Sequence, residues 1–333
     1  MKNTCRLLTP KSAYTVDYPQ AVEFANTQND IHWTHKHIHM EKELQDVLVN
    51  LTEAERHGVV TVLKLFTHYE LFAGNEYWGG RIMKKFPRPA DIQVMANCFS
   101  YFELNVHAPF YNKINELLNL NTDEFYDSYT KDETLKERME FIDKAISSKD
   151  IALSLGVFSL VEGAILYSSF AFLKHFQEGG KNKLLNLVRG INYSVNDENL
   201  HCEGGSWLFR QYIEEMEYEQ YEWDMLCQDI RSAAIDLYDH ECRIVDMIFE
   251  KGSIENIDSY NLKQFVKSRI NHCLGLLNIE PIYNNTENNI SKWFYKNINA
   301  VKLNDQFSGK GNSYNSAWDE TKFAWSGQRT IEW

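Results

Sequence analysis

The sequence is poor in proline, and its six prolines leave most of the chain free to form helices. They are Pro10, Pro19, Pro87, Pro89, Pro109 and Pro281. Proline removes a backbone donor and breaks helix interiors. The long interval between Pro89 and Pro281 contains only Pro109, so it can be helical almost throughout. Runs of short alternating strands joined by hairpin turns are also missing. These absences predict an all-α protein.

Positive charge is scarce as well, because 34 lysine and arginine residues face 47 aspartate and glutamate residues and leave a net charge of −13. Proteins that bind nucleic acids or anionic membranes present basic surfaces, so both classes of partner are disfavoured. Residues 1–10 lack the apolar core of a signal peptide, and we expect no run approaching the roughly 18 apolar residues of a membrane span. A cytoplasmic protein is expected.

The cysteines are scattered and form no Cys-x-x-Cys pair, which argues against zinc-ribbon and thioredoxin-type sites. They are Cys5, Cys98, Cys202, Cys227, Cys242 and Cys273. Single cysteines in helical stretches are most often small buried apolar residues. Free thiols also fit a reducing cytoplasm. A glycine-rich phosphate loop is missing too, so nucleotide chemistry is not expected on this chain.

The hydrophobic pattern predicts one helical domain over residues 1–283, beginning with an irregular N-terminal arm over 1–40. Expected helices lie at about 52–80, 91–120, 133–147, 151–176, 182–218, 224–249 and 262–277. Thr52 and Glu55 have the spacing of a capping box at the start of the first. Residues 284–333 are polar and rich in Asn, Gly and Ser, which predicts a flexible tail.

Glu198 and His201 lie three residues apart, a spacing that places both side chains on one face of a helix. A single pair of this kind is most often part of a solvated face. Three other expected helices carry further candidates, so the order along the chain is Glu, Glu/His, Glu, Glu/His. The six candidate metal ligands are Glu70, Glu103, His107, Glu162, Glu198 and His201. Such a set, drawn from four helices, can hold two adjacent divalent metal ions.

Glu162 is the most informative of the six, because apolar residues such as Phe158, Val161 and Ile165 surround it. A buried carboxylate without a partner costs several kcal/mol, so it requires a cation or a metal. A salt bridge is the alternative, but residues 151–173 contain no arginine or lysine. Carboxylate oxygens favour iron, manganese or one ion of each, and the imidazoles complete the coordination.

The ordered set resembles the small, radical-generating subunit of class I ribonucleotide reductase, over roughly Trp33 to His201. Two residues outside the ligand set strengthen the resemblance. Asp197 matches the aspartate that lies behind the metal ligands in the family, and Trp33 matches the tryptophan that relays electrons to the metal site. The resemblance implies a ferritin-like helical bundle, a homodimer and a dinuclear metal centre.

Glu70 departs from the family pattern, in which the first ligand is normally aspartate. Glutamate keeps the charge but reaches further, which should alter the bridging geometry and the metal preference. Glutamate at this position resembles some phage-encoded members of the family. It therefore points to a viral source, in which case the host cytoplasm is the expected location.

Glu103 and His107 are also spaced one residue further apart than the Glu-x-x-His of the family. An additional residue in a helix is commonly absorbed as a π-bulge, and Pro109 in the same turn favours such a distortion. Counted from His107, Tyr111 takes the position of the family's radical tyrosine. Counted from Glu103, Phe110 takes it, and the oxidant would then remain on the metals. We expect His107 as ligand and Tyr111 as radical residue.

The resemblance implies a centre that reacts with oxygen or a reduced oxygen species and leaves a one-electron oxidant on Tyr111 or on the metals. Trp33, Asp197 and either His107 or a neighbouring ligand would form the hydrogen-bonded exit path. The partner would be a larger catalytic subunit, on which ribonucleoside di- or triphosphates are reduced. The tail would dock there through aromatic residues, with Tyr314 as a candidate redox tyrosine. The anchors would be Trp318, Phe323, Trp325 and Trp333.

Two rival interpretations remain open from the residues. A stand-alone di-metal oxidase or acyl desaturase would use the same six ligands but would not need Trp33, Asp197 or the aromatic tail. The second interpretation is a metal-free helical partner protein or an iron-storage shell. Iron storage fits poorly with the length of the chain and its polar end. Metal content and activity with a large subunit distinguish all three.

Overall fold

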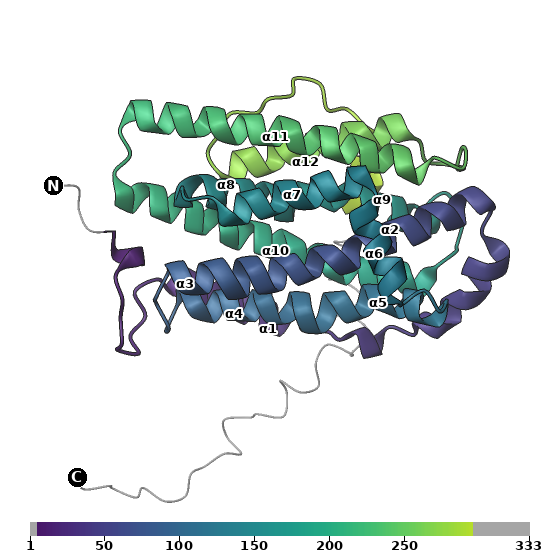
Figure 1. Cartoon of the computed structure of the whole chain (residues 1–333), viewed down its shortest axis with the longest axis horizontal. Helices are drawn as coiled ribbons and strands as arrows, with labels where there is room; N and C mark the ends of the chain where they lie inside the picture. The colour runs from purple at the N-terminus through teal and green to yellow at the C-terminus, as the bar shows by residue number, and fades with distance from the viewer. Residues whose placement is uncertain (1–4, 296–333) are drawn as a thin grey trace, which may run out of the picture.

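The computed structural model describes residues 5–295, which form helices and no strand (Figure 1). The long helices run along the long axis of the molecule. α11 and α12 lie on one side, α2, α4 and α5 lie on the opposite side, and α7, α8 and α10 lie between them (Figure 1). The all-α prediction is confirmed.

The structure divides the chain into α-helices connected or interrupted by short 3₁₀ and π-helical turns. The α-helices are α1 (Pro19–Asp30), α2 (Glu53–Leu71), α3 (Met83–Lys85), α4 (Ile92–Phe102), α5 (Ala108–Leu117), α6 (Asp123–Lys131), α7 (Glu133–Ser147), α8 (Ile151–Leu160), α9 (Tyr167–Lys174), α10 (Leu185–Met216), α11 (Gln220–Ile248) and α12 (Ser259–Leu276). The 3₁₀ turns are η1 (Arg6–Leu8), η2 (His35–His37), η3 (Met40–Glu43) and η8 (His175–Gln177). The π-helical turns are η4 (Asp46–Asn50), η5 (Phe72–Ile82), η6 (Glu103–His107) and η7 (Val161–Ile165).

The N-terminal arm is not irregular as predicted, because it contains α1. Pro19 is the first residue of this helix, a position where the fixed φ of proline is favourable and its missing N–H costs nothing. α1 packs against α4 and α10 and buries Phe24 and Gln28. Pro19 was interpreted as a helix break, although it marks a helix start. The prediction therefore missed α1, which reaches the centre of the bundle.

α2 begins with the predicted capping box. The backbone N–H of Glu55 donates to Thr52 Oγ1 over 3.2 Å, and the Glu55 carboxylate accepts from the N–H of Thr52 over 2.9 Å. Two donors that the first turn of a helix leaves unpaired are thereby satisfied. This start sets the register that carries Glu70 to the centre of the bundle.

Three π-helical turns lie at the centre of the bundle, and the bulge predicted between Glu103 and His107 is confirmed as η6. The N–H of Ala108 donates to the carbonyl of Glu103, five residues back. The wider turn takes up the additional residue and leaves both side chains on one face, as is frequent at functional sites. η7 contains Glu162, and η5 begins at Phe72, just after the end of the helix that carries Glu70.

The stretch Ile151–Gln177 is long and apolar enough to cross a membrane by composition, so the expectation that no run approaches this length was wrong. However, 89% of its apolar window is buried inside the protein. Helices packed on all sides are apolar all round. The stretch forms α8, η7, α9 and η8 at the core of the bundle.

The packed part of the chain extends beyond residue 283, the predicted end of the helical domain. Ile290 and Phe294 are buried against the core, and residues 290–295 form a helical turn. The rest of the predicted tail, with its aromatic anchors, lies outside the described residues. All six cysteines are free thiols, and four of them are buried.

Candidate metal centre

Four neighbouring elements bring the six predicted ligands together. They comprise Glu70 on α2, Glu103 and His107 in η6, Glu162 in η7, and Glu198 and His201 on α10. The donor atoms form two groups, each with all its atoms within 4.8 Å of one another. The first contains Glu70, Glu103, His107 and Glu198, and the second contains Glu103, Glu162, Glu198 and His201. Glu103 and Glu198 are common to both, as expected for residues between two ions.

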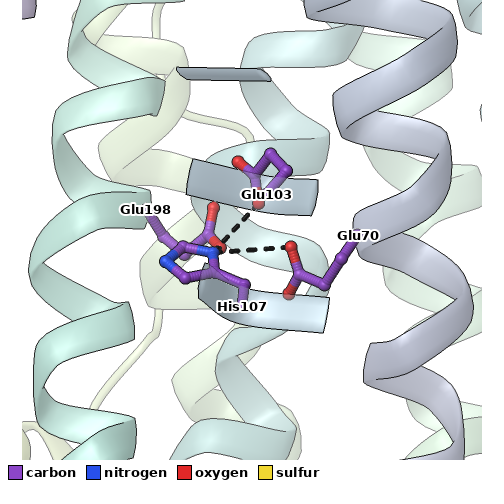
Figure 2. A group of neighbouring side chains, drawn as sticks. All are labelled: Glu70, Glu103, His107 and Glu198. Carbon is purple, nitrogen blue, oxygen red and sulfur yellow. Dashed lines mark hydrogen bonds and ion pairs between the residues drawn. The ribbon is translucent and has the colours of Figure 1, made fainter. Parts of the chain in front are cut away.

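In the first group the carboxylates surround His107 (Figure 2). Its Nδ1 atom lies 2.9 Å from Glu103 Oε2, 3.3 Å from Glu198 Oε1 and 3.5 Å from Glu70 Oε2. All four side chains are fully buried. One nitrogen and three carboxylates therefore converge on one point from three different elements.

In the second group His201 plays the corresponding role. Its Nδ1 atom lies 2.5 Å from Glu103 Oε1 and 3.7 Å from Glu198 Oε2. The contact with Glu103 lacks hydrogen-bond geometry, since both atoms are without a hydrogen-bond partner. His201 Nδ1 and Glu103 Oε1 can each donate a lone pair to a metal ion. Their close approach without a hydrogen bond is the arrangement expected for two ligands of one cation.

Unpartnered oxygens show that these residues fit a metal. Both carboxylate oxygens of Glu70 and of Glu198, and Oε1 of Glu103, are buried without a hydrogen-bond partner. Buried polar atoms are almost always paired, because leaving them unpaired is costly. Oxygen-rich sites completed by imidazole suit iron or manganese. The donor set is compatible with a dinuclear metal site.

The electrostatics of the cluster point the same way. Burial, followed by the charge of Glu103, raises the pKa of Glu70, and burial, followed by the charge of Glu198, raises that of Glu162. Burial opposes protonation of His201, but the charges of Glu103 and Glu198 raise its pKa to about 10. Without cations the cluster therefore retains protons, which divalent ions would displace on binding.

Glu162 is held by two hydrogen-bond donors that the sequence did not reveal. The Tyr69 hydroxyl donates to Oε2 over 3.1 Å, and Trp78 Nε1 donates to Oε1 over 2.7 Å. At about 100° per residue, positions nine apart lie on opposite faces of an α-helix. Trp78 lies within the π-helical segment η5, whose wider turns change the register after Tyr69, so that both side chains reach one carboxylate.

Asp197 lies behind the cluster and connects it to Trp33. Its Oδ2 atom accepts from Trp33 Nε1 over 2.7 Å and lies 2.9 Å from His107 Nε2. Gln28 on α1 donates to Oδ1 over 2.8 Å, and its own oxygen lies 3.1 Å from His201 Nε2. Gln28 contacts His201 directly and His107 by way of Asp197. The sequence did not predict this role, because residues 1–40 were expected to be irregular.

Tyr111, and not Phe110, is on the cluster side of α5. The Tyr111 ring lies 6.4 Å from the His107 ring, and its buried hydroxyl has no hydrogen-bond partner. Phe110 instead packs 5.4 Å from the Trp33 ring and against Gly190, where a side chain would collide with it. Burial, followed by the charge of Glu70, raises the pKa of Tyr111. The radical role of Tyr111 stays a prediction.

Sequence comparisons indicate one family. The family model described as ribonucleotide reductase, small chain, matches residues 11–289. A ribonucleoside-diphosphate reductase small subunit of Dictyostelium discoideum is 23% identical over 314 residues, which cover 90% of this chain and 85% of the relative. A protein of Invertebrate iridescent virus 3 named as the same subunit is 24% identical over 321 residues, covering 90% of this chain and 83% of that protein.

Solved structures support the fold. A class I ribonucleotide reductase from Bacillus halodurans matches with a TM-score of 0.74 at 20% identity, over 84% of this chain and 99% of that one. The dimanganese(II) protein NrdF of Streptococcus sanguinis matches with a TM-score of 0.72 at 19% identity, over 85% of this chain and 97% of that one. At these identities the likeness concerns the fold alone, and the predicted ferritin-like bundle is confirmed.

Proposed function

Because the chain belongs to the small-chain family of ribonucleotide reductase, as the small subunit of a class I enzyme, we propose that it holds a dinuclear metal centre between α2, η6, η7 and α10. The observation that carries the proposal is the cluster of four buried glutamates whose oxygens largely lack partners. Function as part of an oxidoreductase follows from the family.

The proposed ligands divide between two ions. Glu70 and His107 would bind one, Glu162 and His201 would bind the other, and Glu103 and Glu198 would bridge them, in keeping with the two groups of donor atoms. The ions would be iron, manganese or one of each. When bound, the centre supplies the oxidising power for removing one electron from a nearby residue.

The protein side of the reaction is the removal of an electron and a proton from Tyr111. Its hydroxyl is buried without a hydrogen-bond partner. The electron would pass to the metal centre, and the proton would pass to a carboxylate of the cluster such as Glu70, whose charge acts on this hydroxyl. Trp33, Asp197 and His107 then form a hydrogen-bonded path between the cluster and the outer part of the bundle. We assign to this path the transfer of the oxidising equivalent to the large subunit.

The partners are proposed from the same family membership. The large catalytic subunit would reduce the ribonucleotide, and this chain would act as a homodimer. Residues 296–333 of the predicted docking tail would bind the large subunit. The alternative function, a stand-alone oxidase or desaturase, is not favoured. Such an enzyme does not need an electron path to a partner, and it would not explain the hydrogen bond from Trp33 to Asp197.

Replacing Glu162 with glutamine tests the metal site. The wild-type protein should bind about two metals per chain. Glu162→Gln keeps the volume but removes the charge that binds a cation. Its amide oxygen can accept from Trp78, and its NH2 group can donate to the Tyr69 hydroxyl, which also has lone pairs. At least one metal should be lost after gel filtration, as measured by inductively coupled plasma mass spectrometry, while the circular dichroism spectrum is unchanged.

Glu43→Gln provides the matched control. Glu43 is also buried, but it lies outside the cluster and accepts from the backbone and side chain of Asn186. Both bonds go to Oε1, so the amide oxygen of glutamine can accept them, and the change is mild. This variant should retain the metals. Full metal content in Glu162→Gln would remove Glu162 from the ligand set.

A further inference from the structure

A buried arginine on α12 contacts η7 and α10, two of the four elements that carry cluster glutamates. Arg269 Nε donates to the carbonyl of Gly163 over 2.9 Å, and Gly163 directly follows Glu162. Its Nη2 donates to Asn199 Oδ1 over 3.2 Å, and Asn199 directly follows Glu198. One guanidinium thus fixes the backbone of η7 and a side chain of α10, each one residue away from a proposed ligand.

Among residues 5–295, no carboxylate forms an ion pair with Arg269. Its hydrogen-bond partners among the described residues are a carbonyl, an amide oxygen and a phenol, and the ring of Tyr167 stacks 3.8 Å from its guanidinium carbon. The side chain is nonetheless buried, with 2% exposure. Burying a cation is costly unless it is well compensated. The compensation visible in the structure comes from three polar oxygens and the face of the Tyr167 ring, so the contacts with Gly163 and Asn199 are part of what holds the cation in place.

Tyr167 reinforces the connection to α10. Its hydroxyl donates to Asn199 Oδ1 over 2.7 Å, the same oxygen that accepts from Arg269. Two donors therefore hold the Asn199 side chain in one orientation. A second buried arginine, Arg138 on α7, donates to the carbonyl of Ile165 over 2.9 Å at the C-terminal end of η7. Donors from outside the helix thus fix this π-helical turn at its middle residue and at its last residue, as buried carbonyls require.

The same arginine also holds the end of the described chain. Arg269 Nη1 donates to the Tyr295 hydroxyl over 3.0 Å. The preceding residue, Phe294, is fully buried, and its carbonyl accepts from Lys174 Nζ over 3.0 Å. Residues 290–295, which we call the C-terminal strap, are therefore anchored by two buried cations. One of these, Arg269, also contacts η7 and α10.

We propose that Arg269 is a positioning residue that sets the placement of Glu162 and Glu198 and couples it to the seating of the C-terminal strap. The part that concerns ligands rests on the proposed metal centre. The structural part does not, because the hydrogen bonds to Gly163 and Asn199 exist without an ion. Displacing the strap loosens Arg269, and loosening Arg269 releases η7 and the Asn199 side chain.

The first test uses metal-free protein and hydrogen–deuterium exchange. Arg269→Gln should speed exchange of the amides in residues 161–165 by about tenfold, the effect of losing one or two net hydrogen bonds. Tyr295→Phe removes only the contact between the strap and Arg269, so it should speed exchange at the same residues by a smaller factor. It keeps the experiment decisive if Arg269→Gln folds poorly.

Lys174→Met is the matched control, because Lys174 anchors the strap at Phe294 and not through Arg269. It should speed exchange in residues 290–295 more than in 161–165. If Arg269→Gln and Tyr295→Phe both leave exchange in 161–165 at the wild-type rate, the positioning role is wrong.

The second test uses protein loaded with manganese. Arg269→Gln should weaken manganese binding about tenfold and change the electron paramagnetic resonance spectrum of the site, because two ligands shift together. Arg269→Lys, which keeps the charge, should restore affinity in part. A wild-type spectrum and affinity in Arg269→Gln would overturn the inference. If the wild type binds no metal while Arg269→Gln still loosens η7, the proposed centre fails and the positioning of the turn stands.

Discussion

Tyr111→Phe is expected to abolish any tyrosyl radical and to reduce nucleotide reduction with the large subunit to background. Phenylalanine has no hydroxyl proton to lose, so it cannot be oxidised at the potential that oxidises tyrosine. The Tyr111 hydroxyl forms no hydrogen bond, so its removal should change the free energy of unfolding by less than about 1 kcal/mol. Electron paramagnetic resonance after oxygen exposure of the iron-loaded protein provides the measurement, together with metal counting.

Tyr129→Phe is the control for this substitution. Tyr129 is also buried, but its ring packs 4.5 Å from that of His68, which is not a cluster residue. This variant should keep the radical signal. An active wild type without any organic radical would contradict the role of Tyr111 and favour an oxidant that remains on the metals.

Deleting the residues after Ser308 is expected to eliminate activity with the large subunit while metal content and helical content stay unchanged. The deleted segment is polar and carries isolated aromatics, of which Trp318 and Trp325 are examples. Aromatic side chains of this kind dominate binding when a partner provides grooves for them. Binding to the large subunit, measured by surface plasmon resonance, should weaken at least about a hundredfold, the effect of losing two such anchors.

Tyr314→Phe separates docking from electron transfer within this segment. The hydroxyl contributes little to an aromatic anchor, so binding should be retained. Turnover should stop if Tyr314 carries the electron. Normal nucleotide reduction by the truncated protein would refute the docking role of these residues.

The long helices could be predicted because their signals are local. The capping box at Thr52 and the apolar pattern of residues 151–176 each depend on neighbours in the sequence. Helix α1 could not be predicted, because a proline such as Pro19 is compatible with either a helix break or a helix start. Proline breaks a helix interior but favours a first turn, and only the packing of α1 against α4 and α10 decides between them.

The six cluster residues were predictable from their order on four helices, and η6 from one additional residue between Glu103 and His107. The residues that orient the cluster were not. Gln28 reaches Asp197 from 169 positions away, and Trp78 reaches Glu162 only because the wider turns of η5 change the helical register. Such contacts depend on how elements pack, and no spacing along the chain encodes them.

Metal counting combined with electron paramagnetic resonance tests the dinuclear centre most directly. The unsubstituted protein would be reconstituted separately with iron and with manganese and then passed through gel filtration. We predict about two metals per chain and, for manganese, the spectrum of two magnetically coupled ions. Retention of less than about one metal per chain, or a spectrum of isolated ions only, would contradict a centre bridged by Glu103 and Glu198.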